Sequence, residues 1–186
     1  THAGGYVAIY PMHSESRRIE RRSDIIEMLK RDYRVQDVSD FSGLEYDNIF
    51  LEGTGAMVLD HASRLVFAAR SNRANSMALE RFCTRFGYES LVFDAVDSTG
   101  QAIYHTNVMM CIGTAFALIG VEMIPDAQRR AAVVEAIEDS GRDLIALRSD
   151  QILDFAGNAI ELQGPTGRIL VISSRAHRSL DTEQIE

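Results

Sequence analysis

A plan of strands and helices that recurs about every 52 residues is the feature that most constrains how this chain folds. Each unit reads as a polar turn, a strand, a tight turn, a second strand, a helix and a third strand. Glu52 and His105 hold the same place in successive units, 53 residues apart, and Asn107 and Asn158 correspond in the following pair of units. A fixed period of this length indicates a repeat architecture. The predicted units are about 1–50, 51–103, 104–154 and 155–186.

Units of this kind are expected to pack around a shared centre, because a ββαβ unit cannot bury both faces of its sheet and its helix alone. We therefore predict a single α/β domain with three units and roughly half of a fourth. The aligned polar turns would face the centre, so the four side chains named above would converge there. The alternative is an ordinary α/β protein with a loose alternation of strands and helices. The alignment of the polar turns favours the repeat.

The residue types predict where the elements lie. Short runs of β-branched and aromatic residues predict strands, apolar residues at helical spacing predict helices, and Asn75 and Gly87 have the chemistry of a helix N-cap and a helix stop. Strands are expected at Gly5–Tyr10, Ala56–Leu59, Leu65–Ala69, Leu91–Phe93, His105–Gly113, Phe116–Val121, Leu144–Leu147, Phe155–Leu162 and Ile169–Ile172. Helices are expected at about Arg17–Arg31, from Asn75 to Gly87, from Pro125 to about Gly141, and from a start near Ser179.

Composition excludes several classes of protein. The 186 residues carry a formal net charge of −8, which argues against a protein that binds nucleic acid by neutralising phosphates. The sequence has no apolar run of roughly 18 residues, so no membrane span is expected. Two cysteines are too few for a disulfide framework, and they favour a reducing compartment such as the cytoplasm. The basic run Arg17–Arg22 contains Glu20, so it is expected to be a solvated helix start rather than an anion site.

Two residues are candidates for chemistry. Glu52 precedes Gly53-Thr54-Gly55, and glycines there permit close approach of a ligand with N–H groups. His105 has the equivalent place in the next unit and the chemistry of a general acid or base. Taken singly, each has a plainer interpretation, namely a glutamate in a surface turn and a histidine at a polar strand end. Their pairing by the repeat favours the functional interpretation.

The sequence contains no convincing nucleophile. Cys111 follows His105 by six residues in a predicted strand, so their Cα atoms would lie about 20 Å apart, too far for a nucleophile and its base. Cys111 is therefore predicted to be a small buried apolar residue, as is Cys83 in its helix. No G-x-S-x-G motif is present, and no histidine pair has the spacing of metal ligands. We expect neither a metal nor a cofactor.

Three motifs carry a resemblance to a known family. The segments Phe50–Asp60, Tyr104–Gly113 and Phe155–Ala159 are similar to the guanidino-group-modifying superfamily of amidinotransferases and arginine deiminases, and most similar to its citrulline-utilisation hydrolase branch. The resemblance covers essentially the whole chain. It implies the pentein fold, an α/β propeller in which five ββαβ modules surround a central active site. This chain would hold about three and a half of the five modules.

The resemblance also implies a chemistry. Enzymes of the superfamily attack the carbon of a guanidinium or ureido group with a cysteine thiolate, assisted by a histidine and an acidic residue. By motif, Glu52 matches the acidic residue and His105 the histidine. Ser71–Asn75 resembles the S-x-R-T-N segment whose arginine holds the substrate carboxylate, which maps to Arg73. Arginine deiminases carry an aspartate in the place of Asn107, and the neutral amide fits an uncharged ureido group better. Asn107 and Asn158 are thus expected to bind substrate.

The expected function is a hydrolase of C–N bonds other than peptide bonds, acting on a small amino acid with a ureido or guanidino group, with citrulline favoured. The family's cysteine follows a Gly-rich turn that this sequence lacks, and a module precedes the first strand. We therefore expect the chain to be incomplete at both ends and inactive alone. The alternative is a non-catalytic amino-acid-binding or regulatory protein. No nucleic-acid or membrane partner is expected, and open strand edges would favour association between copies.

Overall fold

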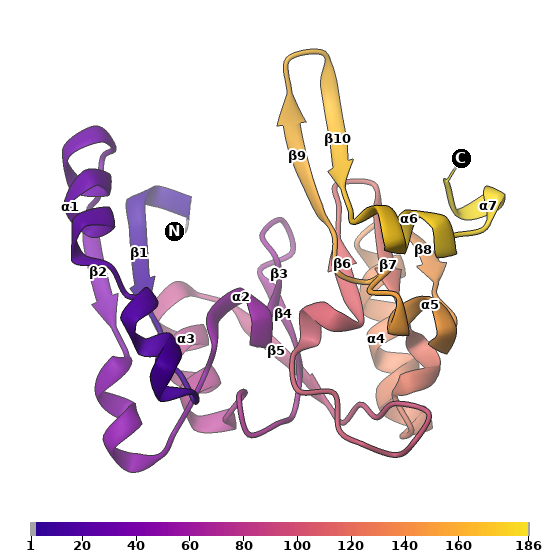
Figure 1. Ribbon diagram of the computed structural model, residues 1–186, viewed down its shortest axis with the longest axis horizontal. Helices are drawn as coiled ribbons and strands as arrows, with labels where there is room; N and C mark the ends of the chain where they lie inside the picture. The colour runs from indigo at the N-terminus through magenta and orange to yellow at the C-terminus, as the bar shows by residue number, and fades with distance from the viewer. Residues whose placement is uncertain (1–2, 186) are drawn as a thin grey trace.

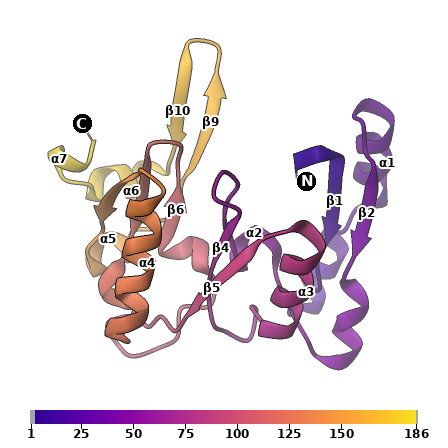
Figure 2. The same ribbon diagram turned by 180° about the vertical axis from the view of Figure 1, so that it is seen from behind.

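The computed structural model describes residues 3–185 and arranges them as four α/β units along an arc (Figure 1). The first unit lies at one end of the arc, and the hairpin of β9 (Ile160–Gly164) and β10 (Gly167–Val171) projects near the other, as the view from behind also shows (Figure 2). In the described part of the chain, no helix has the length and apolar character needed to cross a membrane.

The second and third units have the same topology, which is the order expected from the repeat. In each, a short strand pairs antiparallel with the next strand, a helix follows, and the last strand pairs parallel with the middle one. The second unit consists of β3 (Val58–Asp60), β4 (Leu65–Ala69), α3 (Ser76–Phe86) and β5 (Glu89–Phe93). The third consists of β6 (Met110–Ile112), β7 (Phe116–Ile119), α4 (Ala127–Asp139) and β8 (Asp143–Ala146).

The outer units show part of the same plan. In the first, β1 (Tyr6–Ile9) pairs parallel with β2 (Asp37–Asp40), and α1 (Ser23–Asp32) lies between them in the chain. In the fourth, β9 (Ile160–Gly164) and β10 (Gly167–Val171) form an antiparallel hairpin before α6 (Ser174–Ser179). The described residues thus supply the last three elements of the first unit and the first three of the fourth. The exact unit boundaries stay a prediction.

Short helical turns connect these elements. They are η1 (Ala3–Gly5), η2 (Glu15–Glu20), η3 (Ser42–Asp47), α2 (Gly53–Ala56), η4 (Thr106–Val108), η5 (Val121–Met123), α5 (Ser149–Leu153) and α7 (Thr182–Ile185).

Local chemistry explains the helix that was predicted most closely. The side chain of Asn75 accepts a hydrogen bond from the Met77 amide at 2.9 Å and so caps α3. Gly87 ends the helix with a φ of 66°, a conformation that glycine adopts without strain. The apolar stripe of α3 lies in the core, with Leu79 and Phe82 among its buried residues.

Several expected elements were wrong in extent. The segment His105–Gly113 is not one strand, because the buried Thr106 hydroxyl bonds to two other segments and the chain turns through η4 before β6 begins. The helix expected over Arg17–Arg31 is two helices, η2 and α1, separated where Arg21 leaves helical geometry and its guanidinium pairs with Glu45.

Two further elements begin at other positions than expected. The strand expected from Phe155 begins only at Ile160, because Phe155 has a φ of 64° and its carbonyl accepts the Asn158 amide in a turn. Around Ser179, where one helix was expected to begin, the structure has two: α6, capped by Ser173, ends at Ser179, and α7 begins at Thr182. Similarly, Ala56 ends α2 and the next strand starts at Val58.

The core joins the units to one another. One buried cluster, which includes Phe67, Phe93, Met110 and Ile137, runs from the second unit into the third. A buried ion pair reinforces this junction: the guanidinium of Arg142 contacts both carboxylate oxygens of Asp60 at 2.7 and 2.9 Å. The Arg142 and Asp60 side chains are only 8% and 2% exposed, so the pair lies out of water.

We predict that Arg142→Met destabilises the fold by about 3–5 kcal/mol, because the substitution leaves the Asp60 carboxylate buried without its counter-charge. Urea unfolding measures this directly. Arg70→Met is the matched control, since Arg70 also pairs with an aspartate, Asp94, but both side chains are exposed and such pairs contribute little. Equal losses in the two variants would contradict the role assigned to the buried pair.

Candidate active site

Glu52 is placed at the junction between the first and second units. It is the N-cap residue of the single helical turn α2, and its amide donates to the carbonyl of Arg73 at 3.1 Å. Gly53 follows with a φ of 58°, and a Cβ there would lie 3.1 Å from the Tyr10 ring, so both the backbone and the space favour glycine. This tight turn carries the Glu52 side chain inward, where it is fully buried.

Four groups surround the Glu52 carboxylate. Oε2 accepts hydrogen bonds from His105 Nε2 at 2.7 Å and from Arg73 Nη1 at 3.1 Å, and Arg17 Nη1 lies 3.6 Å away. Oε1 accepts the backbone amide of His13 at 2.9 Å. The partners come from the first, second and third units, so the carboxylate is the point where three units meet.

These contacts set the protonation of the pair. Burial raises the pKa of Glu52, but the hydrogen bonds from the His13 amide, His105 and Arg73 outweigh burial, and the pKa lies below its usual value. Burial lowers the pKa of His105 below 6.5; the Glu52 carboxylate opposes this shift, whereas Arg73 and Arg17 add to it. At neutral pH the site therefore holds an ionised carboxylate and a neutral imidazole.

The imidazole has a defined orientation. Because an ionised carboxylate only accepts hydrogen bonds, the proton of neutral His105 is assigned to Nε2, and Nδ1 keeps its lone pair. The ring lies against α2, where a Cβ on Gly55 would come within 3.1 Å of Nδ1. The Tyr104 ring packs against the His105 ring, with centroids 4.9 Å apart, and the Arg73 guanidinium lies over the Tyr104 ring. Neutral His105 can therefore accept a proton at Nδ1 while Glu52 holds the opposite edge.

The two asparagines predicted to bind substrate line a different hollow from the surroundings of Glu52. Asn107 and Asn158 line one hollow of about 780 Å³ together with Thr54, which holds the equivalent place in the second unit. Within the described residues, no hydrogen bond joins either asparagine side chain to Glu52 or His105. The structure thus brings Glu52, His105 and Arg73 into contact and places Asn107 and Asn158 with each other. The substrate-binding roles of the asparagines stay predictions.

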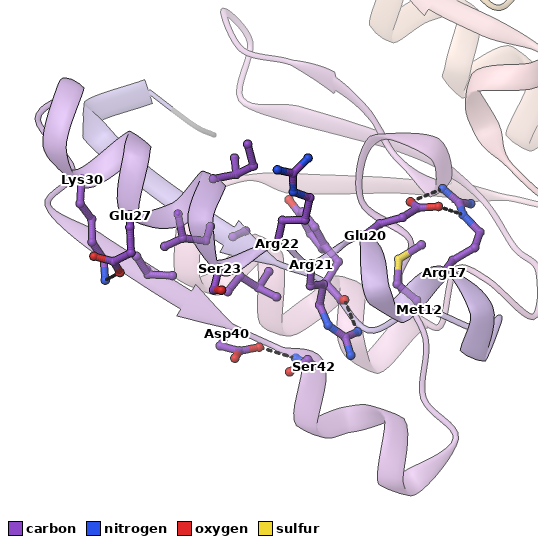
Figure 3. Close-up of a pocket in the computed structure, with 16 residues that line it drawn as sticks. Met12, Arg17, Glu20, Arg21, Arg22, Ser23, Glu27, Lys30, Asp40 and Ser42 are labelled. Carbon is purple, nitrogen blue, oxygen red and sulfur yellow. Dashed lines mark hydrogen bonds and ion pairs between the residues drawn. The ribbon is translucent and has the colours of Figure 1, made fainter.

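A second hollow of about 660 Å³ lies beneath η2 and α1 (Figure 3). Its charged side chains have partners within the hollow or beside it: Arg17 pairs with Glu20, Lys30 with Glu27, Arg21 with Glu45 and Arg22 with Asp24. Since these charges already have partners, this hollow is a weaker candidate for a ligand site than the surroundings of Glu52.

Sequence reasoning missed the contribution of the first unit. We had expected the run Arg17–Arg22 to be a solvated helix start, yet Arg17 reaches the buried carboxylate and the His13 amide donates to it. Nothing in the local pattern distinguishes Arg17 from its basic neighbours, because the distinction depends on how two units pack.

Neither cysteine is prepared for nucleophilic attack. Cys83 and Cys111 are buried as expected, and burial raises the pKa of each thiol to about 11. In the described residues, no group of three histidine, cysteine or acidic side chains is arranged to hold a metal ion.

Comparison with known proteins places these observations in a family. The family model described as N,N dimethylarginine dimethylhydrolase, eukaryotic, matches residues 1–186. No curated protein sequence matches the chain. Among solved structures, the apo form of ArgZ, an arginine dihydrolase from the ornithine-ammonia cycle in cyanobacteria, is similar with a TM-score of 0.67 at 15% identity, over 94% of this chain and 26% of that one.

Two other structures are similar at lower scores. A substrate-bound variant of the N-terminal domain of ArgZ has a TM-score of 0.63 at 16% identity, over 88% of this chain and 59% of that one. A dimethylarginine dimethylaminohydrolase variant, as its adduct with S-methyl-L-thiocitrulline, has a TM-score of 0.55 at 14% identity, over 86% of this chain and 54% of that one. The chain therefore spans between about a quarter and three-fifths of the length of these structures. At such identities the likeness shows the fold, and the propeller fold expected from the sequence is confirmed.

We predict that the pKa of His105 is below 6.5 and responds to its charged neighbours. Arg73→Met should raise this pKa, because it removes a nearby positive charge, whereas Glu52→Gln should lower it. NMR titration of the ring measures both shifts, and Arg129→Met on the distant α4 should cause neither.

The same shift affects stability. Below pH 6.5 the unfolded chain binds a proton that the folded protein does not, so the free energy of unfolding should fall as the pH drops from 6.5 towards the lower pKa of folded His105. A His105→Gln variant should lose this slope. A pKa above 6.5 in the folded protein would contradict the charge arrangement described.

Proposed function

Because this chain belongs to the N,N dimethylarginine dimethylhydrolase family, and so to the pentein superfamily of guanidino-modifying enzymes, we propose that it carries part of a hydrolase site for a ureido or guanidino amino acid. The observation that supports this most is the hydrogen bond between Glu52 and His105. Two residues 53 positions apart meet at 2.7 Å, with the carboxylate fully buried and the imidazole only 11% exposed.

Each residue has a distinct proposed role. The Nδ1 lone pair of neutral His105 takes the proton of an attacking thiol, and the resulting thiolate forms a bond to the ureido or guanidino carbon. The imidazolium then gives that proton to the departing amine. Without this proton the amine would have to leave as an anion, which is a poor leaving group. A water molecule, deprotonated by the same imidazole, then attacks that carbon and the C–S bond breaks, and the departing thiolate takes the proton back from the imidazolium. Glu52 steadies His105 through Nε2 and stabilises the transient imidazolium.

The charge balance favours a neutral reacting group. Arg73 pairs with the Glu52 carboxylate, Arg17 is shared between Glu52 and Glu20, and His105 is neutral, so the charges around Glu52 are already balanced. A substrate carboxylate would be attracted to Arg73, but a cationic guanidinium would bring a positive charge that no unpaired carboxylate beside Glu52 offsets. Asn107 offers only a neutral amide at the place where, by the resemblance, arginine deiminases carry an aspartate that could offset this positive charge. Citrulline, whose ureido group is uncharged, is the proposed substrate.

The thiol is proposed to come from outside these 186 residues. Cys111 lines the hollow with Asn107 and Asn158, but it is nine-tenths covered and its raised pKa leaves almost no thiolate at neutral pH. The same observation supports a second candidate, a pocket that binds an amino acid without turnover. Product formation distinguishes the two.

We predict that the chain binds L-citrulline more tightly than L-arginine or N,N-dimethyl-L-arginine. Isothermal titration calorimetry measures all three. Arg73→Met should weaken citrulline binding by about tenfold or more, the loss expected for a charge-assisted hydrogen bond to a carboxylate. Arg70→Met, three residues away and paired with Asp94, should bind as the wild type does.

Tighter binding of arginine than of citrulline would contradict the charge argument. Absence of binding by all three ligands would contradict the proposed function itself. If a longer chain that includes the proposed cysteine binds citrulline but forms no ammonia or ornithine, the amino-acid-binding alternative is favoured.

A further inference from the structure

Two hydroxyl groups, neither of which takes part in the proposed chemistry, hold the backbone on the two sides of His105. Thr106 follows the histidine and is completely buried. Ser71 lies in another unit, on the loop that carries Arg73. A buried hydroxyl that neither reacts nor faces solvent needs a structural reason, because its desolvation is offset only by the bonds that it makes.

Thr106 joins three segments of the chain. Its Oγ1 donates to the carbonyl of Ala56 at 2.6 Å, and Ala56 ends the helical turn that begins after Glu52. The same oxygen accepts the amide of Ala69 at 2.8 Å, at the end of β4 just before the Arg73 loop. One hydroxyl therefore fixes the residue after His105 against both the Glu52 turn and the strand that leads to Arg73.

Ser71 does the same on the other side. Its Oγ donates to the carbonyl of Tyr104, the residue before His105, at 2.8 Å. It also accepts the backbone amide of Arg73 at 3.1 Å. The two hydroxyls thus hold residues 104 and 106, and between them they contact the segments that carry Glu52, Arg73 and His105.

We infer that Thr106 and Ser71 are positioning residues that clamp His105 from both sides and so hold its Nε2 on the Glu52 carboxylate. The purpose that we assign to the clamp rests on the proposed function, whereas its hydrogen bonds form without a substrate. A histidine that must accept a proton and return it gains from such restraint, because a site loses rate when its groups depart from productive geometry. Gly55 completes the arrangement by leaving room for the ring.

Exchange of the His105 Nε2 proton with water tests the clamp. In a ¹⁵N-labelled protein this proton should be protected by its bond to Glu52, and the His105→Gln variant assigns its signal. Thr106→Val keeps the shape but removes the hydroxyl, and Thr106→Ser keeps the hydroxyl. Ser71→Ala removes the second hydroxyl at a half-buried site. Thr114→Val is the control, since its hydroxyl also bonds across units, to Glu161, but far from His105.

The expected result is exchange roughly tenfold faster in Thr106→Val and in Ser71→Ala, as for loss of the hydrogen bonds that each hydroxyl makes to backbone groups, and wild-type exchange in Thr106→Ser and Thr114→Val. A merely structural threonine would lower the melting temperature and leave exchange in the folded protein unchanged. If Thr106→Val does not fold, Ser71→Ala decides.

Wild-type exchange in Ser71→Ala overturns the clamp, and so does fast exchange in Thr106→Ser or Thr114→Val. Because no ligand is added, a failure of citrulline binding leaves this readout intact. A protected Nε2 proton in a protein that binds no amino acid would refute the proposed function and leave the clamp standing.

Discussion

The buried carboxylate of Glu52 is the group on which the rest of the arrangement depends. An ion removed from water is costly unless charges and hydrogen bonds replace the solvent. Here the His13 amide and Arg17 come from the first unit, Arg73 from the second and His105 from the third. The units must therefore pack in one relative orientation for the carboxylate to be satisfied, and that orientation is also the one that forms the candidate site.

The same carboxylate underlies the ligand preference that we propose. Arg73 already offsets the Glu52 charge and Arg17 is shared between Glu52 and Glu20, so no carboxylate there is left to balance a cationic ligand group. The charges of Arg73 and Arg17 also add to burial in keeping His105 neutral, with its Nδ1 lone pair available. Chemistry and specificity thus follow from one local balance of charge, while the hydroxyls of Thr106 and Ser71 keep the imidazole in place.

Much of this could be read from the sequence, and the remainder could not for physical reasons. The period near 52 residues predicts equivalent positions for Glu52 and His105, and each is the N-cap residue of a helical turn before a strand. The Asn75 cap and the Gly87 stop bound α3. The turn at η4 was missed because it depends on where the Thr106 hydroxyl finds partners in distant segments. Arg17 was missed because its role arises only when two units meet. Whether copies of the chain associate stays a prediction.

The most direct measurement is a crystal structure of this chain with L-citrulline bound. We predict that the ureido group lies within hydrogen-bond distance of Glu52 or His105, with the ligand carboxylate on Arg73 and the Glu52–His105 bond retained. A citrulline molecule bound away from this pair, or a structure in which Glu52 and His105 lie apart, would contradict the claim that the repeat assembles a guanidino-type hydrolase site at this carboxylate.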